Sequence, residues 1–243
     1  MKQKRHHHPE GGRPWPPLPR LSRPTLRDRI EVLYEDPDLL VIEKAAGIVT
    51  YPVEGFEKDT AIQLIRQYWK FQGKENKHLY LIHRIDKDTS GLLVFAKTSL
   101  ARSSLQDQFA GHSVVRQYVA ATSGIPRKKS GTIRTMIGHD SRRRRAVSTR
   151  GKESITEYQV LKENHSLQRA LISCKLYTGR THQIRIHLSH IGTPVIGDRV
   201  YGRPQFSAQP LALHASTLGF IHPRTERPIL FQTSLPESLR KLV

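Results

Sequence analysis

Apolar residues along this chain form short runs that are separated by turn-forming residues. Residues 30–34 and 39–42 flank the polar turn at 35–38 and predict two strands. Residues 79–82 and 92–95 predict two more, on either side of a polar loop at 83–91. Further strand-like runs follow at 114–122, 154–161, 167–176, 211–220 and 228–232. The chain is therefore predicted to be rich in strands.

Three segments show a helical spacing instead. Asp59 and Thr60 can cap a helix whose apolar positions are Ile62, Ile65 and Trp69. A second helix is predicted from residue 99 to about residue 109. A third is predicted from about 181 to 191, ended by a glycine at 192. Many strands with about three helices predict an α+β fold on an antiparallel or mixed sheet.

Positive charge is concentrated in two segments of the chain. The net charge is +19, and residues 1–27 carry seven Lys/Arg with one acid, while residues 127–150 carry nine with one acid. The second segment includes the row Arg142, Arg143, Arg144 and Arg145. Such clusters favour contact with the phosphates of RNA or DNA, although a solvated surface would have the same composition. Residues 1–27, rich in proline, are predicted to be a disordered arm, and residues 28–243 the folded domain.

Other features limit the cellular setting. No apolar run is long enough to cross a membrane, and the basic N-terminus is not followed by an apolar core, so no membrane partner or signal peptide is expected. The lone cysteine, Cys174, is interpreted as a buried residue in a reducing cytoplasm. Nothing in the sequence demands more than a monomer. The histidines at 6–8 fit a polar tail, a metal-binding tract or an expression tag.

The polar loop at 83–91 holds the first candidate chemistry. Asp86 lies between Arg84 and Lys87, which favour an ionised carboxylate able to act as nucleophile or base. The same residues also suit an ordinary turn in which Asp86 and Asp88 cap backbone amides.

A second polar segment, 178–187, surrounds the start of the third predicted helix. Arg180 precedes this helix, and Arg180 or Arg185 can pair with a carboxylate or a phosphate. His182, Gln183 and Arg185 are candidate RNA contacts, with plain surface polarity as the alternative. Tyr118 lies in an apolar strand pattern, which favours a core position over base stacking.

Cofactor and metal motifs are missing from the sequence. His187 and His190 lie three residues apart, but no HExxH or cysteine-rich spacing accompanies them, so no metal is predicted. The glycine motifs of Walker and dinucleotide-binding proteins are also missing, so no nucleotide cofactor is predicted.

Together these segments resemble the RluA-type family of RNA pseudouridine synthases. The family pattern HRLDxxTSGLLLxAK matches HRIDKDTSGLLVFAK at 83–97, and GRTHQIRVHLxxxGxPVxGDxxYG matches residues 179–202. RQYVAATSG at 116–124, LALHA at 211–215 and EKAAGIVTYP at 43–52 are similar to further family segments. The likeness spans about residues 30–235.

The resemblance implies a fold, an activity and roles for individual residues. The fold is the pseudouridine synthase core, a mixed, mostly antiparallel sheet around a central cleft. The activity converts uridine to pseudouridine in structured RNA, ribosomal or transfer, without cofactor or metal. Asp86 is expected to be the catalytic aspartate, and Arg180 to pair with it and hold it ionised. Tyr118 is expected to stack on the target base and assist proton removal, and Arg84 to help expel that base. His83 belongs to the same motif and is expected to contact the RNA.

The sequence also departs from the family pattern. Ala45 stands in place of a proline, Tyr51 in place of a histidine, and Arg116 where a lysine is common. The first two lie near a loop expected to contact RNA, so they bear on specificity. Relatives often carry an S4-type RNA-binding domain, for which residues 1–27 leave no room. The arm and residues 127–150 are hypothesised to supply affinity instead.

Two rival functions remain compatible with the residues. One is a non-catalytic RNA-binding or assembly protein on the same fold, which the presence of both Asp86 and Arg180 disfavours. The other is a hydrolase in which Asp86 and Asp88 hold a divalent metal, which a chelator would inactivate.

Overall fold

The computed structural model describes residues 25–26, 29–56, 58–73 and 78–243. The predicted disordered arm lies outside the described residues, except for residues 25 and 26. These two form a short strand paired with β2, so regular structure begins inside the segment assigned to the arm.

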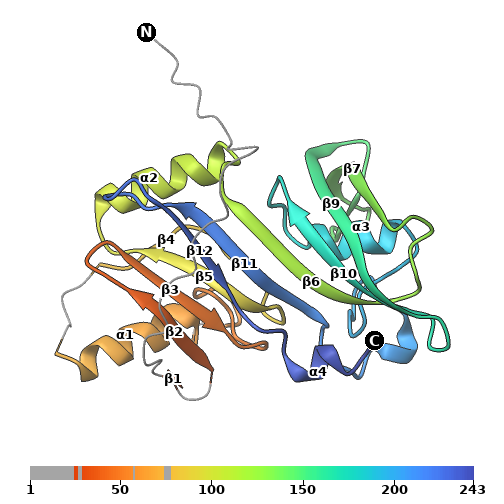
Figure 1. Cartoon of the computed structure of the whole chain (residues 1–243), viewed down its shortest axis with the longest axis horizontal. Coiled ribbons are helices and arrows are strands. Elements are labelled where there is room, and N and C mark those ends of the chain that lie inside the picture. The colour runs from red at the N-terminus through yellow and green to blue at the C-terminus, as the bar shows by residue number, and fades with distance from the viewer. Residues whose placement is uncertain (1–24, 27–28, 57, 74–77) are drawn as a thin grey trace, which may run out of the picture.

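Twelve strands form a single mixed sheet (Figure 1). They are β1 (Thr25–Leu26), β2 (Ile30–Glu35), β3 (Leu39–Lys44), β4 (Tyr80–Leu81), β5 (Ser90–Ala96), β6 (Val115–Ser123), β7 (Ser130–His139), β8 (Arg145–Val147), β9 (Gly151–Asn164), β10 (Arg169–Leu176), β11 (Leu213–Ile221) and β12 (Pro228–Gln232). The helices are α1 (Ala61–Phe71), α2 (Ser99–Ala110), α3 (Gln183–His190) and α4 (Glu237–Arg240), with a 3-10 turn at Pro204–Phe206.

The strand order is β1-β2-β3-β5-β11-β6-β10-β9-β7-β8, with β4 paired to β5 and β12 to β11. Among the described strands, only β5 and β11 pair in parallel, which confirms the predicted mixed, mostly antiparallel sheet. That pairing depends on Gly91, at φ +115°, because a Cβ there would lie 2.3 Å from the carbonyl oxygen of Ala215.

Helices cover both faces of the sheet, which explains the unbroken apolar runs of the central strands. On β3, Leu40 and Ile42 belong to the core shared with α1, while Leu39 and Val41 face the core under α2. A strand buried on both faces has no polar positions to alternate with. The predicted cap of α1 is confirmed, because the Thr60 side chain and Gln63 form a reciprocal capping box.

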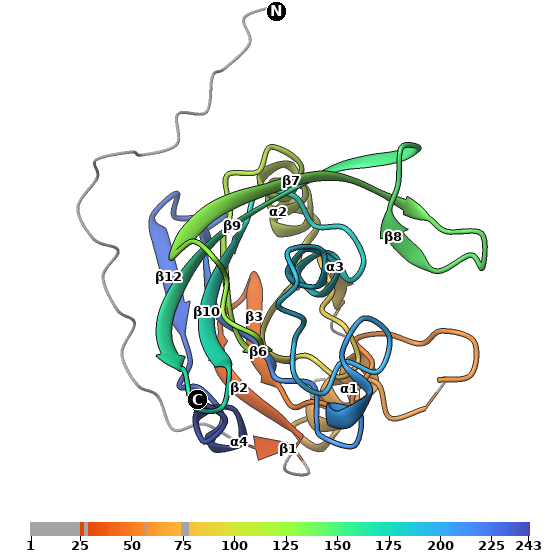
Figure 2. The same ribbon diagram turned by 90° about the vertical axis from the view of Figure 1, so that its right-hand side faces the viewer.

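The half of the sheet built from β7, β9 and β10 curls around α3 (Figure 2). Buried polar contacts fix this helix inside the curve. His187, fully buried, bonds through its two ring nitrogens to Thr135 on β7 at 3.0 Å and Thr156 on β9 at 2.8 Å. The α3 segment is thereby held at one end of the sheet, facing the loop that joins β4 to β5.

The hairpin of β7 and β8 was not predicted. Its turn is set by Asp140, whose carboxylate accepts hydrogen bonds from the backbone N–H groups of Arg142 and Arg144, and by Arg143 at φ 58°.

Within the described residues, no helix is long and apolar enough to cross a membrane.

Candidate active site

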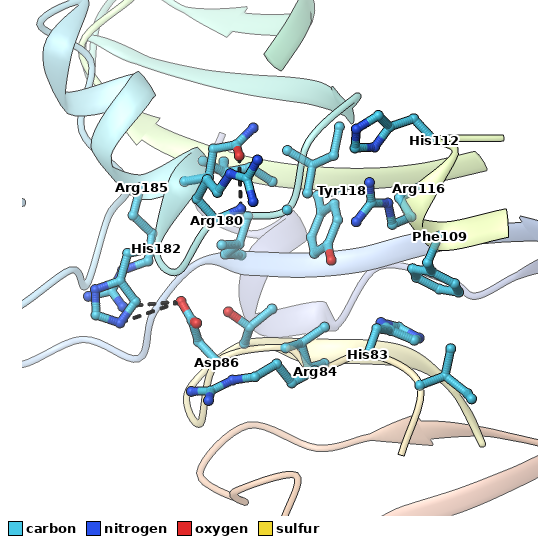
Figure 3. A pocket seen from close by; sticks show the side chains of 18 of the residues that line it. His83, Arg84, Asp86, Phe109, His112, Arg116, Tyr118, Arg180, His182 and Arg185 are labelled. Carbon is cyan, nitrogen blue, oxygen red and sulfur yellow. Dashed lines mark hydrogen bonds and ion pairs between the residues drawn. The ribbon is translucent and has the colours of Figure 1, made fainter. Parts of the chain in front are cut away.

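A cavity of about 500 Å³ lies between the two halves of the sheet (Figure 3). Four segments that are distant in sequence supply most of its lining. They are the loop after β4, the end of α2 with the residues after it, the first residues of β6, and the turn into α3. The predicted residues Asp86, Tyr118 and Arg180 all line this cavity, as do His83, Arg84, His182 and Arg185.

Asp86 forms its ion pair with Arg185. Nη1 of Arg185 donates to Oδ2 of Asp86 at 3.3 Å, and the rest of the guanidinium forms two bonds with Asp198, at 2.7 and 2.9 Å. Asp198 is fully buried and also accepts the backbone N–H groups of Val200 and Tyr201. Arg185 is therefore fixed from behind by one carboxylate while it holds another at the cavity surface.

The pKa values of Arg185 and Asp198 reflect their ion pair. Burial alone would lower the pKa of Arg185, but its bonds to Asp198 and Asp86 raise it above the usual value. Burial would raise the pKa of Asp198, but the Arg185 guanidinium and two backbone donors lower it overall.

The expected partner of Asp86, Arg180, is not the arginine that the structure pairs with it. Nε of Arg180 donates to the carbonyl of Glu153 at 3.3 Å, and its backbone N–H is bound by the Gln183 side chain. The helix begins at Gln183 rather than near residue 181, so Arg180 precedes it while Arg185 lies on its first turn. Both arginines belong to the sequence motif, and the structure shows that Arg185 is the one that faces Asp86.

The loop that carries Asp86 is supported from behind by residues 44–50. The ammonium of Lys44, fully buried, donates to the carbonyls of Ala45 and Lys87 at 2.9 and 3.0 Å. Burial lowers the pKa of Lys44 to about 7, against the opposing effect of Asp88 and Asp86. Thr50 donates to the carbonyl of Ile85 at 3.2 Å. These bonds fix the backbone on both sides of Asp86.

Tyr118 projects from β6 into the cavity between Asp86 and Arg116 (Figure 3). Only 8% of its surface is exposed. Burial raises the pKa of Tyr118 to about 12, with Arg116 opposing and Asp86 adding to the rise. The phenol is therefore neutral near pH 7 and presents an aromatic face and a hydroxyl rather than a phenolate.

The other motif residues of the loop differ in exposure. His83 stacks on Phe109 with ring centroids 4.6 Å apart, and its Nε2 accepts the Val94 N–H at 3.2 Å. Burial and the nearby Arg116 lower the pKa of His83 to about 3, so the ring is neutral. Arg84 is exposed, and its guanidinium donates to the Tyr51 hydroxyl at 2.8 Å and lies 5.3 Å from that ring's centre.

His182 completes the Asp86 side of the cavity. It precedes α3 in a left-handed conformation, φ 58°, and its Nδ1 is 3.0 Å from the Tyr201 hydroxyl. Its Nε2 lies 3.9 Å from Asp86. Burial lowers the pKa of His182 despite the opposing effect of Asp86.

The four consecutive arginines lie outside the cavity, at the β7–β8 turn. Arg142, Arg143 and Arg144 are exposed and Arg145 is half-buried. Arg144 forms an ion pair with Asp140 and also contributes to the electrostatics of Tyr201, at the cavity's His182 side. A charge on this turn is therefore close enough to act on Tyr201, which contacts His182. Within the described residues, no group of three or more His, Cys, Asp or Glu side chains is placed to bind a metal.

Two residues of this site were missed in the sequence. Asp198 stands inside the matched motif at 179–202, and Lys44 inside the segment 43–52, yet neither was given a role. A buried acid and a buried lysine reveal their partners only when the fold brings distant segments together.

Comparison with known proteins identifies the family. A profile described as RNA pseudouridylate synthase matches residues 38–190. The RNA pseudouridine synthase YlyB of Bacillus subtilis is 38% identical over 219 residues, covering 88% of this chain and 72% of its own. Ribosomal large subunit pseudouridine synthase D of Zymomonas mobilis is 37% identical, covering 93% and 76%.

The fold is shared with solved structures as well. Human RNA pseudouridylate synthase domain containing 4 superposes with a TM-score of 0.72 at 24% identity, covering 89% of this chain and 92% of that one. The matches at 83–97 and 179–202 thus meet at one cavity within a fold that the family shares. The chain belongs to the RNA pseudouridine synthase family and is an RNA-modifying isomerase.

Proposed function

We propose that this chain isomerises uridine in large-subunit ribosomal RNA, with Asp86 as the catalytic carboxylate. The observation that carries the proposal is the Asp86–Arg185–Asp198 chain, which presents one carboxylate to the cavity in a fixed position. The ribosomal substrate is suggested by relatives named ribosomal large subunit pseudouridine synthase D, at 37% and 38% identity.

The reaction requires no redox partner or group donor. The bond from N1 of the base to C1′ of the ribose breaks, the base turns, and C5 bonds to C1′. The hydrogen at C5 leaves as a proton and N1 gains one, so substrate and product have the same composition. An ionised carboxylate suits either attack on the sugar or base, or removal of the 2′ proton.

Four further residues at the cavity have roles in this scheme. Arg185 orients the Asp86 carboxylate and balances its charge. Tyr118 offers its ring to the extruded base, because an aromatic face stacks on any base. Its high pKa suits a neutral hydroxyl that relays a proton rather than a base ionised in advance. Arg84 and His182 lie on either side of Asp86, where they contact the RNA around the target.

The target uridine must leave its stack to enter this cavity. Unstacking costs about a few kcal/mol, which contacts to the phosphates and stacking inside the cavity offset. The row Arg142–Arg145 supplies such phosphate contacts from the β7–β8 turn. We propose that the chain acts as a monomer in the cytoplasm, where ribosomal RNA is found.

The test uses RNA labelled with tritium at C5 of uridine, since the reaction releases that hydrogen to water. Full-length transcripts of large-subunit rRNA and a set of tRNA transcripts are incubated with the wild type, Asp86→Asn and Asp88→Asn, with chelator present. We expect tritium release from rRNA with the wild type and with Asp88→Asn, and none with Asp86→Asn.

Each alternative has its own outcome in this experiment. Release from tRNA alone would contradict the ribosomal substrate. Equal loss in both aspartate variants, together with inhibition by chelator, would favour a metal-dependent reaction that uses both carboxylates.

A further inference from the structure

The charges around the cavity are distributed unevenly. On the Asp86 side, Arg185 lies between two carboxylates, those of Asp86 and Asp198. Arg116 lies beyond Tyr118 as seen from Asp86, and Arg180 lies between Tyr118 and Arg185 (Figure 3). Neither Arg116 nor Arg180 pairs with a carboxylate of the described residues.

Arg116 has no hydrogen-bond acceptor among the described residues. Its Nε is buried without a partner, and its guanidinium carbon lies 5.5 Å from the centre of the Phe109 ring. Gly179 makes this position possible, because a Cβ there would come within 2.7 Å of Nη1 of Arg116. The guanidinium is thereby directed along the cavity wall, with its donors unused.

Arg180 is the residue after Gly179, and it also lines this cavity. Its Nε bonds to a backbone carbonyl, which leaves its charge unbalanced. His112 lies near both arginines. Burial lowers the pKa of His112, and the charges of Arg116 and Arg180 lower it further. Three basic side chains therefore converge with no acid of the described chain between them.

Such an arrangement is unfavourable for the protein alone. Like charges that are partly removed from water repel one another and lose hydration, and an anion relieves both costs. Uracil is neutral and gives these groups no charge to bind. The phosphodiester on either side of an extruded nucleotide carries one negative charge and offers oxygens to a guanidinium fork.

We propose that Arg116 and Arg180, with His112 beside them, form a phosphate subsite that binds a phosphodiester next to the target uridine. The inference rests on the proposed function, because it requires an RNA nucleotide in this cavity. The subsite fixes the extruded nucleotide by its backbone while Tyr118 and Asp86 face its base and sugar.

Arg169 provides a matched control within the same chain. Its Nε is also buried without a partner, and its guanidinium lies 5.3 Å from the centre of the Phe206 ring. It differs in donating to the Leu242 carbonyl and in lying outside the cavity. Arg169→Met therefore removes a similar cation and a similar ring contact without touching the proposed subsite.

Binding is measured by calorimetric titration of the full chain with two probes, uridine and uridine 3′,5′-bisphosphate. The wild type and Arg169→Met should bind the bisphosphate at least about tenfold more tightly than uridine, as expected for a charge-assisted contact. Arg116→Met and Arg180→Met should lose most of that ratio, and Arg116→Lys should retain part of it. Arg180→Met keeps the test valid if Arg116→Met fails to fold, because the Arg180 side chain is only half-buried.

Equal binding of the two probes by the wild type would overturn the proposal, as would an unchanged ratio in both methionine variants. This titration needs no turnover, so it is independent of the tritium assay. A chain that released no tritium yet showed the expected ratios would contradict the proposed function and leave the phosphate subsite standing.

Discussion

Replacing Asp198 by asparagine tests whether the position of Asp86 depends on a residue that the RNA does not reach. Asp198 is fully buried, and the side chain of Arg185 is 9% exposed, so their two bonds are shielded from water. An asparagine side chain keeps one acceptor oxygen. Its NH₂ group replaces the other oxygen, so that a donor would face the donating guanidinium of Arg185. Arg185 would then keep one bond to residue 198 and its longer bond to Asp86, at 3.3 Å.

The expected loss of stability follows from these contacts. Removing one partner of a buried ion pair costs about 3–5 kcal/mol. The retained acceptor and the remaining carboxylate reduce this, so we expect the free energy of unfolding to fall by about 2–4 kcal/mol. For a chain of this size, each kcal/mol lowers Tm by about 2–4 °C, giving a decrease of roughly 4–16 °C.

The effect on catalysis should exceed the effect on binding. With one of its bonds to residue 198 lost, Arg185 holds the Asp86 carboxylate less firmly, and a displacement of about 1 Å can reduce the rate about 100-fold. We expect kcat of tritium release to fall by that order while KM changes little. Activity is measured well below the Tm of the variant, so that the folded fraction does not limit it.

Asp38→Asn is the matched control for this variant. Asp38 also binds an arginine, Arg224, through both carboxylate oxygens, but at a distance from the cavity. It should lower Tm, by less because Arg224 is 58% exposed, and leave kcat unchanged. If Asp198→Asn also lowered Tm but kept kcat within about twofold of the wild type, the proposed control of Asp86 by Asp198 would be refuted.

The same pair makes a prediction about pH. The folded state lowers the pKa of Asp198, so its contribution to stability is present above the unfolded pKa of about 3.9. It is lost as the pH falls through the lower, folded value. The stability difference between wild type and Asp198→Asn should therefore be constant from pH 7 to 5 and shrink below pH 4, as measured by denaturant unfolding.

Two further predictions concern other parts of the site. Changing Arg142 and Arg143 together to serine should raise KM for rRNA, leave kcat unchanged and reduce the slope of log affinity against log salt by about 2, since each contributes one phosphate contact; an unchanged slope would argue against this surface. The folded state lowers the pKa of Lys44 from 10.5 to about 7, so the unfolded chain binds the extra proton between these values. The unfolding free energy of the wild type, relative to Lys44→Met, should therefore rise from pH 7 to 10, and a flat difference would contradict this.

Much of the fold follows from local sequence patterns. The apolar runs that became β3 and β5 contrast with turn residues on either side, and Thr60 with Gln63 marks the start of α1. These features depend on residues close in sequence, so a single chain reveals them. The segment 127–150 was interpreted from its charge alone, and its hairpin was missed. On β7 the buried apolar side chains are only Ile133 and Ile137, and the polar Arg134 and Thr135 lie between them.

The site divides in the same way between what local sequence predicts and what it does not. Asp86 and Tyr118 were predicted from motifs, and both line the cavity. The residues alone left Arg180 and Arg185 both open as ion-pair partners, and the family resemblance implied Arg180 as the partner of Asp86, whereas the structure pairs Asp86 with Arg185. Sequence patterns place helix boundaries only to within a few residues, so they do not show which of the two arginines faces a carboxylate on a distant segment.

The distribution of charge across the cavity connects these observations. Where the chemistry requires a fixed carboxylate, the protein supplies the counter-ion itself, because Arg185 pairs with both Asp86 and Asp198. Where RNA enters, Arg116 and Arg180 lack such partners, so a phosphate of the substrate supplies the negative charge that balances them. A cavity with both walls paired would be more stable but would give the RNA backbone nothing to bind. A cavity with neither wall paired would leave Asp86 free to turn away from the sugar.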